Sequence, residues 1–272
     1  MNYIAQKIIP YLVVVFIYMA VAIDFWRGAK SADNHQQLKL HSTMVALGLV
    51  IHGWLLYQVI FANGFNLGFF NMLSAIAWLT VLIYWVADLK HQLTSLQAFV
   101  LPPAAIFALL PASNAANHMM PSSESPLFLA HIGIALLAYS LFTFATLHAL
   151  LMTIAERTLH NKATLIKLPS FPPLMVMEGL LFKIIGLGFI LLTITLISGM
   201  LFSEQIFNKP LQFNHKTIFS IASWFIYGGL LYGRFKYGWR GAKAIRWTLA
   251  GFVLLLLAYV GSKFILQVLL GR

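Results

Sequence analysis

The residues of this chain best suited to chemistry are histidines that lie in or beside long apolar segments. His131 is the clearest case, because it stands a few residues inside an apolar run that lasts to about residue 152. A helix rises about 1.5 Å per residue, so a run of this length can cross a bilayer. An ionisable ring in such a helix is costly unless a neighbouring helix binds it or a site uses it. His131 is therefore either a structural histidine or a ligand.

The composition determines the class of protein. Hydrophobic residues make up 60% of the chain and charged residues only 9%, whereas a soluble domain has about 25% charged residues. We therefore predict an all-α, polytopic membrane protein in contact with the lipid bilayer. The sequence contains no cysteine, which excludes disulfides, thiolate metal sites, iron–sulfur clusters and thioether attachment of haem to this chain.

Eight apolar segments predict a bundle of about eight transmembrane helices. The first is preceded by Lys7 and lacks a convincing cleavage site, so we expect a retained span rather than a signal peptide. The fourth is the shortest, and Pro102-Pro103 near its start makes a broken or tilted helix an alternative. We predict a single integral-membrane domain over residues 1–272. The segments are 8–26, 42–61, 69–87, 96–111, 126–152, 179–202, 217–232 and 247–269.

Basic residues set the predicted orientation. The formal net charge is +11, and the Lys and Arg residues lie in short connections between apolar runs, a pattern typical of membrane topology rather than of nucleic-acid binding. The first, third, fifth and seventh connections hold three, one, three and five of them, whereas 62–68 and 112–125 hold none. Positive residues remain in the cytoplasm. We therefore predict a multi-pass protein of the bacterial inner membrane with both termini on the outer, periplasmic side.

This topology sorts the nine histidines by depth. His52 and His131 fall in the outer half of their helices, His118 in an outer loop, and His215 at the outer end of the seventh segment. The other five are expected at cytoplasmic connections or inner helix ends, where a solvated or interfacial role is the default; they are His35, His41, His91, His148 and His160.

Imidazoles that project from separate helices are suitable axial ligands for haem or ligands for a divalent metal. The acidic residues lie in outer loops or at inner helix ends, so no carboxylate shares the depth of these histidines. This distribution argues against a zinc hydrolase and against a proton relay. Aromatic residues that could surround a haem also fit an ordinary interfacial belt; they are Trp54, Tyr57, Phe61, Phe128 and Trp224.

Several motifs resemble the haem-handling cytochrome c assembly family of membrane proteins. The helix Ala-His-Ile-Gly-Ile-Ala-Leu-Leu-Ala-Tyr-Ser at 130–140 is similar to that family's histidine-bearing helix. The stretches 224–227, 238–243, 250–252 and 258–263 resemble its last two helices, and 172–178 resembles the small eight-span bacterial branch of HemX-like and YpjD-like proteins. The resemblance extends over about 40–270.

The resemblance implies that the protein moves haem across the membrane, or holds it at the outer face, for attachment to apocytochromes c. His131 matches the first of the family's histidines that flank a tryptophan-rich outer loop, and His52 resembles that of an earlier helix. The Trp-Trp-Asp type run is missing, and residues 203–216 stand in its place, with His215 as a substitute ligand. A further family histidine is replaced around 232–233.

Two hypotheses from different classes follow. In the first, the protein is a carrier or assembly factor and not an enzyme, with haem iron held by His131 and His52 and with other cytochrome c assembly proteins as partners. In the second, it is a haem-free scaffold or regulatory protein with the same fold, whose cytoplasmic basic loops bind a partner. A secondary transporter needs broken helices and a polar site at the midplane, and only Pro102-Pro103 suggests one.

Overall fold

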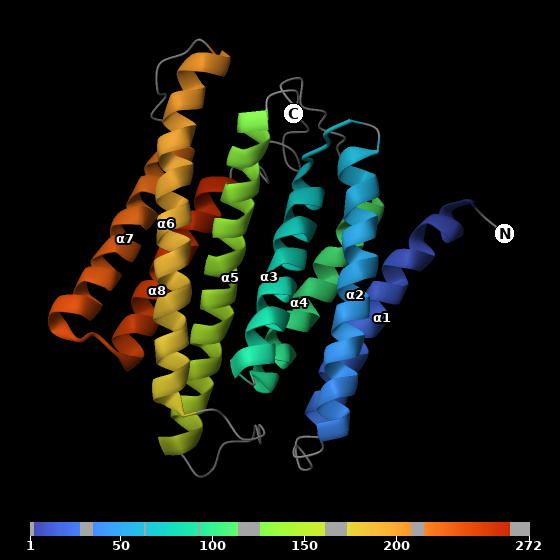
Figure 1. The fold of residues 1–272 in the computed structure, drawn as a ribbon, viewed down its shortest axis with the longest axis horizontal. Coiled ribbons are helices and arrows are strands. Elements are labelled where there is room, and N and C mark those ends of the chain that lie inside the picture. The colour runs from blue at the N-terminus through green and yellow to red at the C-terminus, as the bar shows by residue number, and fades with distance from the viewer. Residues whose placement is uncertain are drawn as a thin grey trace. The chain divides into compact units, whose positions relative to one another are not determined.

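The computed structural model describes residues 3–27, 35–62, 64–91, 93–113, 126–160, 173–207 and 215–261 (Figure 1). Within these residues the chain forms eight α-helices, which confirms the all-α prediction. They are α1 (Tyr3–Arg27), α2 (His35–Phe61), α3 (Phe69–His91), α4 (Gln97–Leu109), α5 (Pro126–His160), α6 (Leu174–Phe207), α7 (His215–Tyr237) and α8 (Gly241–Leu256).

Six of the helices in the described ranges are long and apolar enough to cross a membrane, which fits a multi-pass protein. The apolar stretches are Ile8–Arg27, Gln36–Phe61, Phe69–His91, Pro126–Arg157, Leu174–Leu201 and Gly241–Tyr259. The remaining two helices are α4, which is only 13 residues long, and α7, whose sequence is more polar. The count of eight spans and the orientation of the termini remain predictions.

Helix α4 is continuous although it contains Pro102 and Pro103. A proline inside a helix removes one N–H donor and crowds the carbonyl four residues earlier. Here those carbonyls belong to Ala98 and Phe99 in the first turn of the helix, directly after the 3₁₀ turn Thr94–Leu96. The cost of both prolines therefore falls on one end of α4, and the alternative of a broken helix is wrong.

The helices cluster into two compact units. The first unit contains α1 to α4, and the second contains α6 from Met175, α7, α8 and α5 up to Thr153. The prediction of a single integral-membrane domain is not tested by this division and remains a prediction.

In the first unit, α1 and α3 each pack against both α2 and α4. Two tryptophans of α3 donate indole hydrogen bonds to α2. Trp78 Nε1 lies 2.8 Å from the Leu49 carbonyl oxygen, and Trp85 Nε1 lies 3.0 Å from Ser42 Oγ. These bonds fix α2 and α3 side by side, and the buried ring of Tyr18 on α1 lies against Gly48 and His52 of α2.

In the second unit, the fully buried ring of Tyr227 on α7 forms the centre of the packing. It stacks on Phe142 of α5 with ring centroids 4.0 Å apart, and its hydroxyl donates to the Thr248 carbonyl of α8 over 3.3 Å. Trp224 Nε1 donates to Thr193 Oγ1 at 2.8 Å and so connects α7 to α6. All four helices of this unit are thus linked around α7.

Candidate functional site

His131 lies on α5 in a half-buried position of the second unit. Its Nδ1 is 2.7 Å from Ser198 Oγ on α6. The ring of Phe128, one turn earlier, is stacked with the imidazole at a centroid distance of 6.5 Å. A Cβ atom at Gly199 would lie 3.5 Å from His131 Cε1, so the imidazole rests against the bare backbone of α6.

The hydrogen bonds of Ser198 favour one tautomer of His131. The hydroxyl has a single proton, and Ser198 Oγ lies 2.7 Å from the Ile194 carbonyl oxygen and 3.2 Å from that of Thr195, which can only accept. When that proton goes to the Ile194 carbonyl, Ser198 accepts a hydrogen bond from Nδ1–H of His131. In that tautomer Nε2 carries the lone pair, which is the form of histidine that ligates metals. Sequence reasoning missed Ser198, whose only signal was a small polar residue in an apolar helix.

His52 lies on α2 in the first unit and is 1% exposed. Its Nε2 is 2.9 Å from Ser74 Oγ on α3, and its Nδ1 is 3.5 Å from the hydroxyl of Tyr18 on α1. Because serine and tyrosine hydroxyls can both donate and accept, either tautomer satisfies both ring nitrogens. His52 therefore connects three helices through its own side chain.

The other predicted outer histidines are in less enclosed places. His215 is the first residue of α7 and is exposed, and it belongs to the second unit, as does His131. His118 lies outside the described residues. Within the described ranges, no group of three or more His, Cys, Asp or Glu side chains is placed to hold a metal ion.

His148 corrects one expectation from the sequence. It was expected at an inner helix end, but it is 0% exposed, and its Nε2 donates to the Met177 carbonyl of α6 over 2.9 Å. The ring lies between its own helix and α6, stacked on Phe144 at a centroid distance of 6.1 Å, and α5 continues past it to His160, well beyond the predicted end at 152. Nδ1 of His148 has no hydrogen-bond partner within the described part of the chain.

The five aromatic residues proposed for a haem pocket divide into three groups. Phe128 contacts His131. Trp224 is used in packing, stacked on Phe189 with centroids 5.3 Å apart. The other three form a ladder along α2 and are more than half exposed; they are Trp54, Tyr57 and Phe61.

Comparison with known proteins places the chain in a family. The family model described as "Cytochrome C assembly protein" matches residues 40–270, the same extent as the resemblance seen in the sequence. The "Inner membrane protein YpjD" of Escherichia coli K12 is 31% identical over 212 residues, which cover 76% of this chain and 78% of that protein. The "Cytochrome c biogenesis protein CcsA" of Prochlorococcus marinus is 22% identical over 279 residues, covering 90% and 86%.

A third relative, an uncharacterised 28.8 kDa protein of Azospirillum brasilense, is 34% identical over 141 residues, or 52% of each chain. The family match and the similarity to the Escherichia coli protein both extend over most of the chain. The chain therefore belongs to the cytochrome c assembly protein family.

Proposed function

We propose that this protein binds haem at the outer side of the inner membrane and acts in cytochrome c assembly as a carrier or assembly factor, without catalysing a reaction. The observation that carries the proposal is the 2.7 Å hydrogen bond between His131 Nδ1 and Ser198 Oγ, which orients the imidazole; with the proton on Nδ1, Nε2 carries the lone pair. An imidazole whose tautomer is fixed by a second side chain is the usual arrangement of a metal-ligating histidine. The proposal is also supported by a relative named as a cytochrome c biogenesis protein.

The residues around His131 fit haem as the cargo. The neutral imidazole supplies a nitrogen ligand for iron. Phe128 provides an aromatic surface, and Gly199 lets the imidazole lie against the backbone of α6. His52 and His215 are the proposed candidates for a second ligand. For His52 to bind iron, one ring nitrogen would have to give up its present contact: Nε2 its contact with Ser74, or Nδ1 its contact with Tyr18.

The proposal includes the orientation predicted from the basic residues. With eight spans and both termini periplasmic, His131 lies a few residues inside the outer end of α5, since that helix begins at Pro126. A ligand at this depth is within reach of the periplasmic space, where apocytochromes c would receive haem. The basic connections would then face the cytoplasm.

The test is the visible spectrum of the detergent-purified protein, oxidised and dithionite-reduced, with a pyridine haemochrome assay for stoichiometry. We expect about one haem per chain and loss of the Soret band in His131→Ala. Ser198→Ala should weaken haem binding about 10- to 100-fold, because removing a group that orients a metal ligand has effects of this size. His91→Ala, at the last residue of α3, is the matched control and should leave the spectrum unchanged. A colourless protein that takes up no added haem would contradict the proposal.

A second candidate function is favoured by His52, whose two nitrogens already have partners inside the protein. In this proposal the protein is a haem-free scaffold or regulator that keeps the family fold and binds a protein partner through its cytoplasmic loops. His131→Ala would then lower thermal stability without any change in absorption. The same spectra and an unfolding curve of each variant distinguish the two functions.

A further inference from the structure

The connection between α7 and α8 is a tightly fixed turn. Gly238 has a φ of +65°, a conformation that favours glycine, and its N–H donates to the Arg234 carbonyl over 3.1 Å. The N–H of Trp239 donates to the Gly233 carbonyl over 3.2 Å. The bond from Gly238 is the one that closes the αL motif, in which the first residue after a helix has a positive φ and its N–H donates to the carbonyl four residues earlier. The indole of Trp239 covers Gly233 so closely that a side chain there would collide with it.

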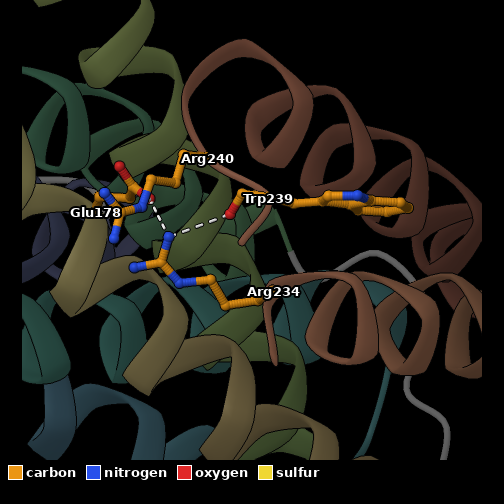
Figure 2. Close-up of polar contacts among 4 residues, drawn as sticks. All are labelled: Glu178, Arg234, Trp239 and Arg240. Carbon is orange, nitrogen blue, oxygen red and sulfur yellow. Dashed lines mark hydrogen bonds and ion pairs between the residues drawn. The ribbon is translucent and has the colours of Figure 1, made fainter. Parts of the chain in front are cut away.

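A carboxylate from α6 holds the turn in place, as Figure 2 shows. Arg234 Nη1 is 2.5 Å from Glu178 Oε1 and 3.2 Å from the Trp239 carbonyl oxygen. Arg240 Nε lies 3.7 Å from the same carboxylate oxygen. Glu178 is only 12% exposed, so two arginines share one enclosed carboxylate and a positive charge is left over.

Further cations lie around this turn on aromatic rings. Lys243 Nζ is 3.8 Å from the centroid of the Trp239 ring, and Lys236 Nζ is 5.6 Å from that of Tyr232. Residues 232–247, here named the basic turn, contain five Lys or Arg residues and no Asp or Glu. Four of the five are exposed; they are Lys236, Arg240, Lys243 and Arg246.

The basic turn lies at the ends of apolar helices. The apolar stretch of α8 begins at Gly241 and that of α6 begins at Leu174, four residues before Glu178. Exposed aromatic side chains accompany the cations; Phe235 is 92% exposed and Tyr237 is 63% exposed. Aromatic rings beside Lys and Arg at the end of a transmembrane helix are typical of the headgroup layer of a bilayer.

We propose that the basic turn is a binding site for the headgroups of anionic phospholipids. Charge complementarity selects an anionic partner, and the apolar stretches that begin beside the turn place it in the headgroup layer, where the phosphates of lipids lie. Membrane topology alone requires only the positive charges. It does not require the Glu178 contact or the Trp239 ring, and these two features fix the cations in one arrangement.

The test uses the full chain in detergent and measures retention of phosphatidylglycerol against phosphatidylcholine with the same acyl chains, by native mass spectrometry. We expect a clear preference for phosphatidylglycerol. Each Lys or Arg near an anionic membrane surface contributes about fivefold to binding. The affinity of the triple variant Lys236→Gln, Lys243→Gln, Arg246→Gln for phosphatidylglycerol should therefore fall more than about tenfold. The single variant Lys243→Gln is used if the triple variant does not fold, and its affinity should fall about fivefold.

The control removes the same charge from the first unit: Arg27→Gln, Lys39→Gln and Lys90→Gln, all exposed, should change the affinity less than about threefold. Equal losses in the two triple variants, or equal retention of the two lipids by the wild-type chain, would overturn the proposal. Displacement of bound phosphatidylglycerol by inorganic phosphate would overturn it as well, because the site would then take the free anion.

Discussion

The two units each place a histidine within a helix bundle, but they hold it in opposite ways. In the first unit, His52 is 1% exposed and both of its nitrogens face hydroxyl groups from neighbouring helices. In the second unit, His131 is half-buried, and its Nδ1 lies 2.7 Å from the hydroxyl of Ser198, whose own proton can go to the Ile194 carbonyl. Since a metal-ligating imidazole is usually oriented by a hydrogen bond at its other nitrogen, the second unit has the arrangement expected of a ligand, and the first has that of a structural connector.

This difference shows that depth in the membrane does not by itself identify a ligand. Both histidines are predicted in the outer half of a helix, and their apolar surroundings look alike in the sequence. What separates them is the partner oxygen. The Ser198 hydroxyl can donate its proton to the Ile194 carbonyl of its own helix, whereas the hydroxyls of Ser74 and Tyr18 can adapt to either tautomer of His52.

The largest expected effect separates the two histidines by stability. His52→Ala leaves a cavity and strips two buried hydroxyls of a partner, so we expect the free energy of unfolding to fall by about 2–4 kcal/mol. His131→Ala removes a half-buried ring and its hydrogen bond to Ser198, and should cost less than about 1 kcal/mol. Thermal or denaturant unfolding of the haem-free protein in detergent measures both.

A larger loss in His131→Ala than in His52→Ala would break the comparison, because it would make His131 the structural connector. His91→Ala again serves as the control. Its side chain is the last of α3 and is only partly buried, so its unfolding curve should match that of the wild-type chain.

A second variant disturbs the first unit without touching His52. A Cβ at Gly48 would lie 2.6 Å from Cε1 of the buried Tyr18 ring. Gly48→Ala should therefore displace that ring from beside His52 and cost about 1–3 kcal/mol of unfolding free energy.

The matched control is Gly133→Ala on α5, where a Cβ would meet nothing within 4 Å. This change replaces glycine with the best helix former and should be neutral or slightly stabilising. Equal destabilisation in the two variants, measured by thermal unfolding in the same detergent, would mean that the close approach of Tyr18 to α2 does not hold the first unit together.

The sequence allowed much of the fold to be predicted, because long apolar segments leave few choices in a bilayer. Seven of the eight predicted segments fall within, or differ by at most two residues from, a helical range of the structure, and the last overlaps α8 as far as it is described. Helix ends were predicted less well. Helix α5 continues to His160, an extension that was missed because its polar final turns carry no apolar signal.

The candidate site was predicted only in part. The type of residue and its depth pointed to His131, but the hydrogen bond to Ser198 joins residues 67 positions apart. No pattern among neighbouring residues of the sequence indicates that two such distant residues are in contact. The same holds for Glu178 and Arg234, which come from different helices and meet only in the folded unit.

The smallest expected effect compares one tyrosine hydroxyl in each unit. Tyr139 donates to the Leu255 carbonyl over 3.0 Å, just before the π-helical turn Leu257–Gly261, whereas Tyr18 lies 3.5 Å from His52 Nδ1, at the limit of a hydrogen bond. Hydrogen bonds between membrane helices contribute about 0.6 kcal/mol on average. Tyr139→Phe should therefore cost about that much and Tyr18→Phe less, in paired unfolding curves. A larger cost for Tyr18→Phe would mean that Tyr18 fixes the proton of His52 as Ser198 fixes that of His131, and the two histidines would then be equally prepared to bind a metal.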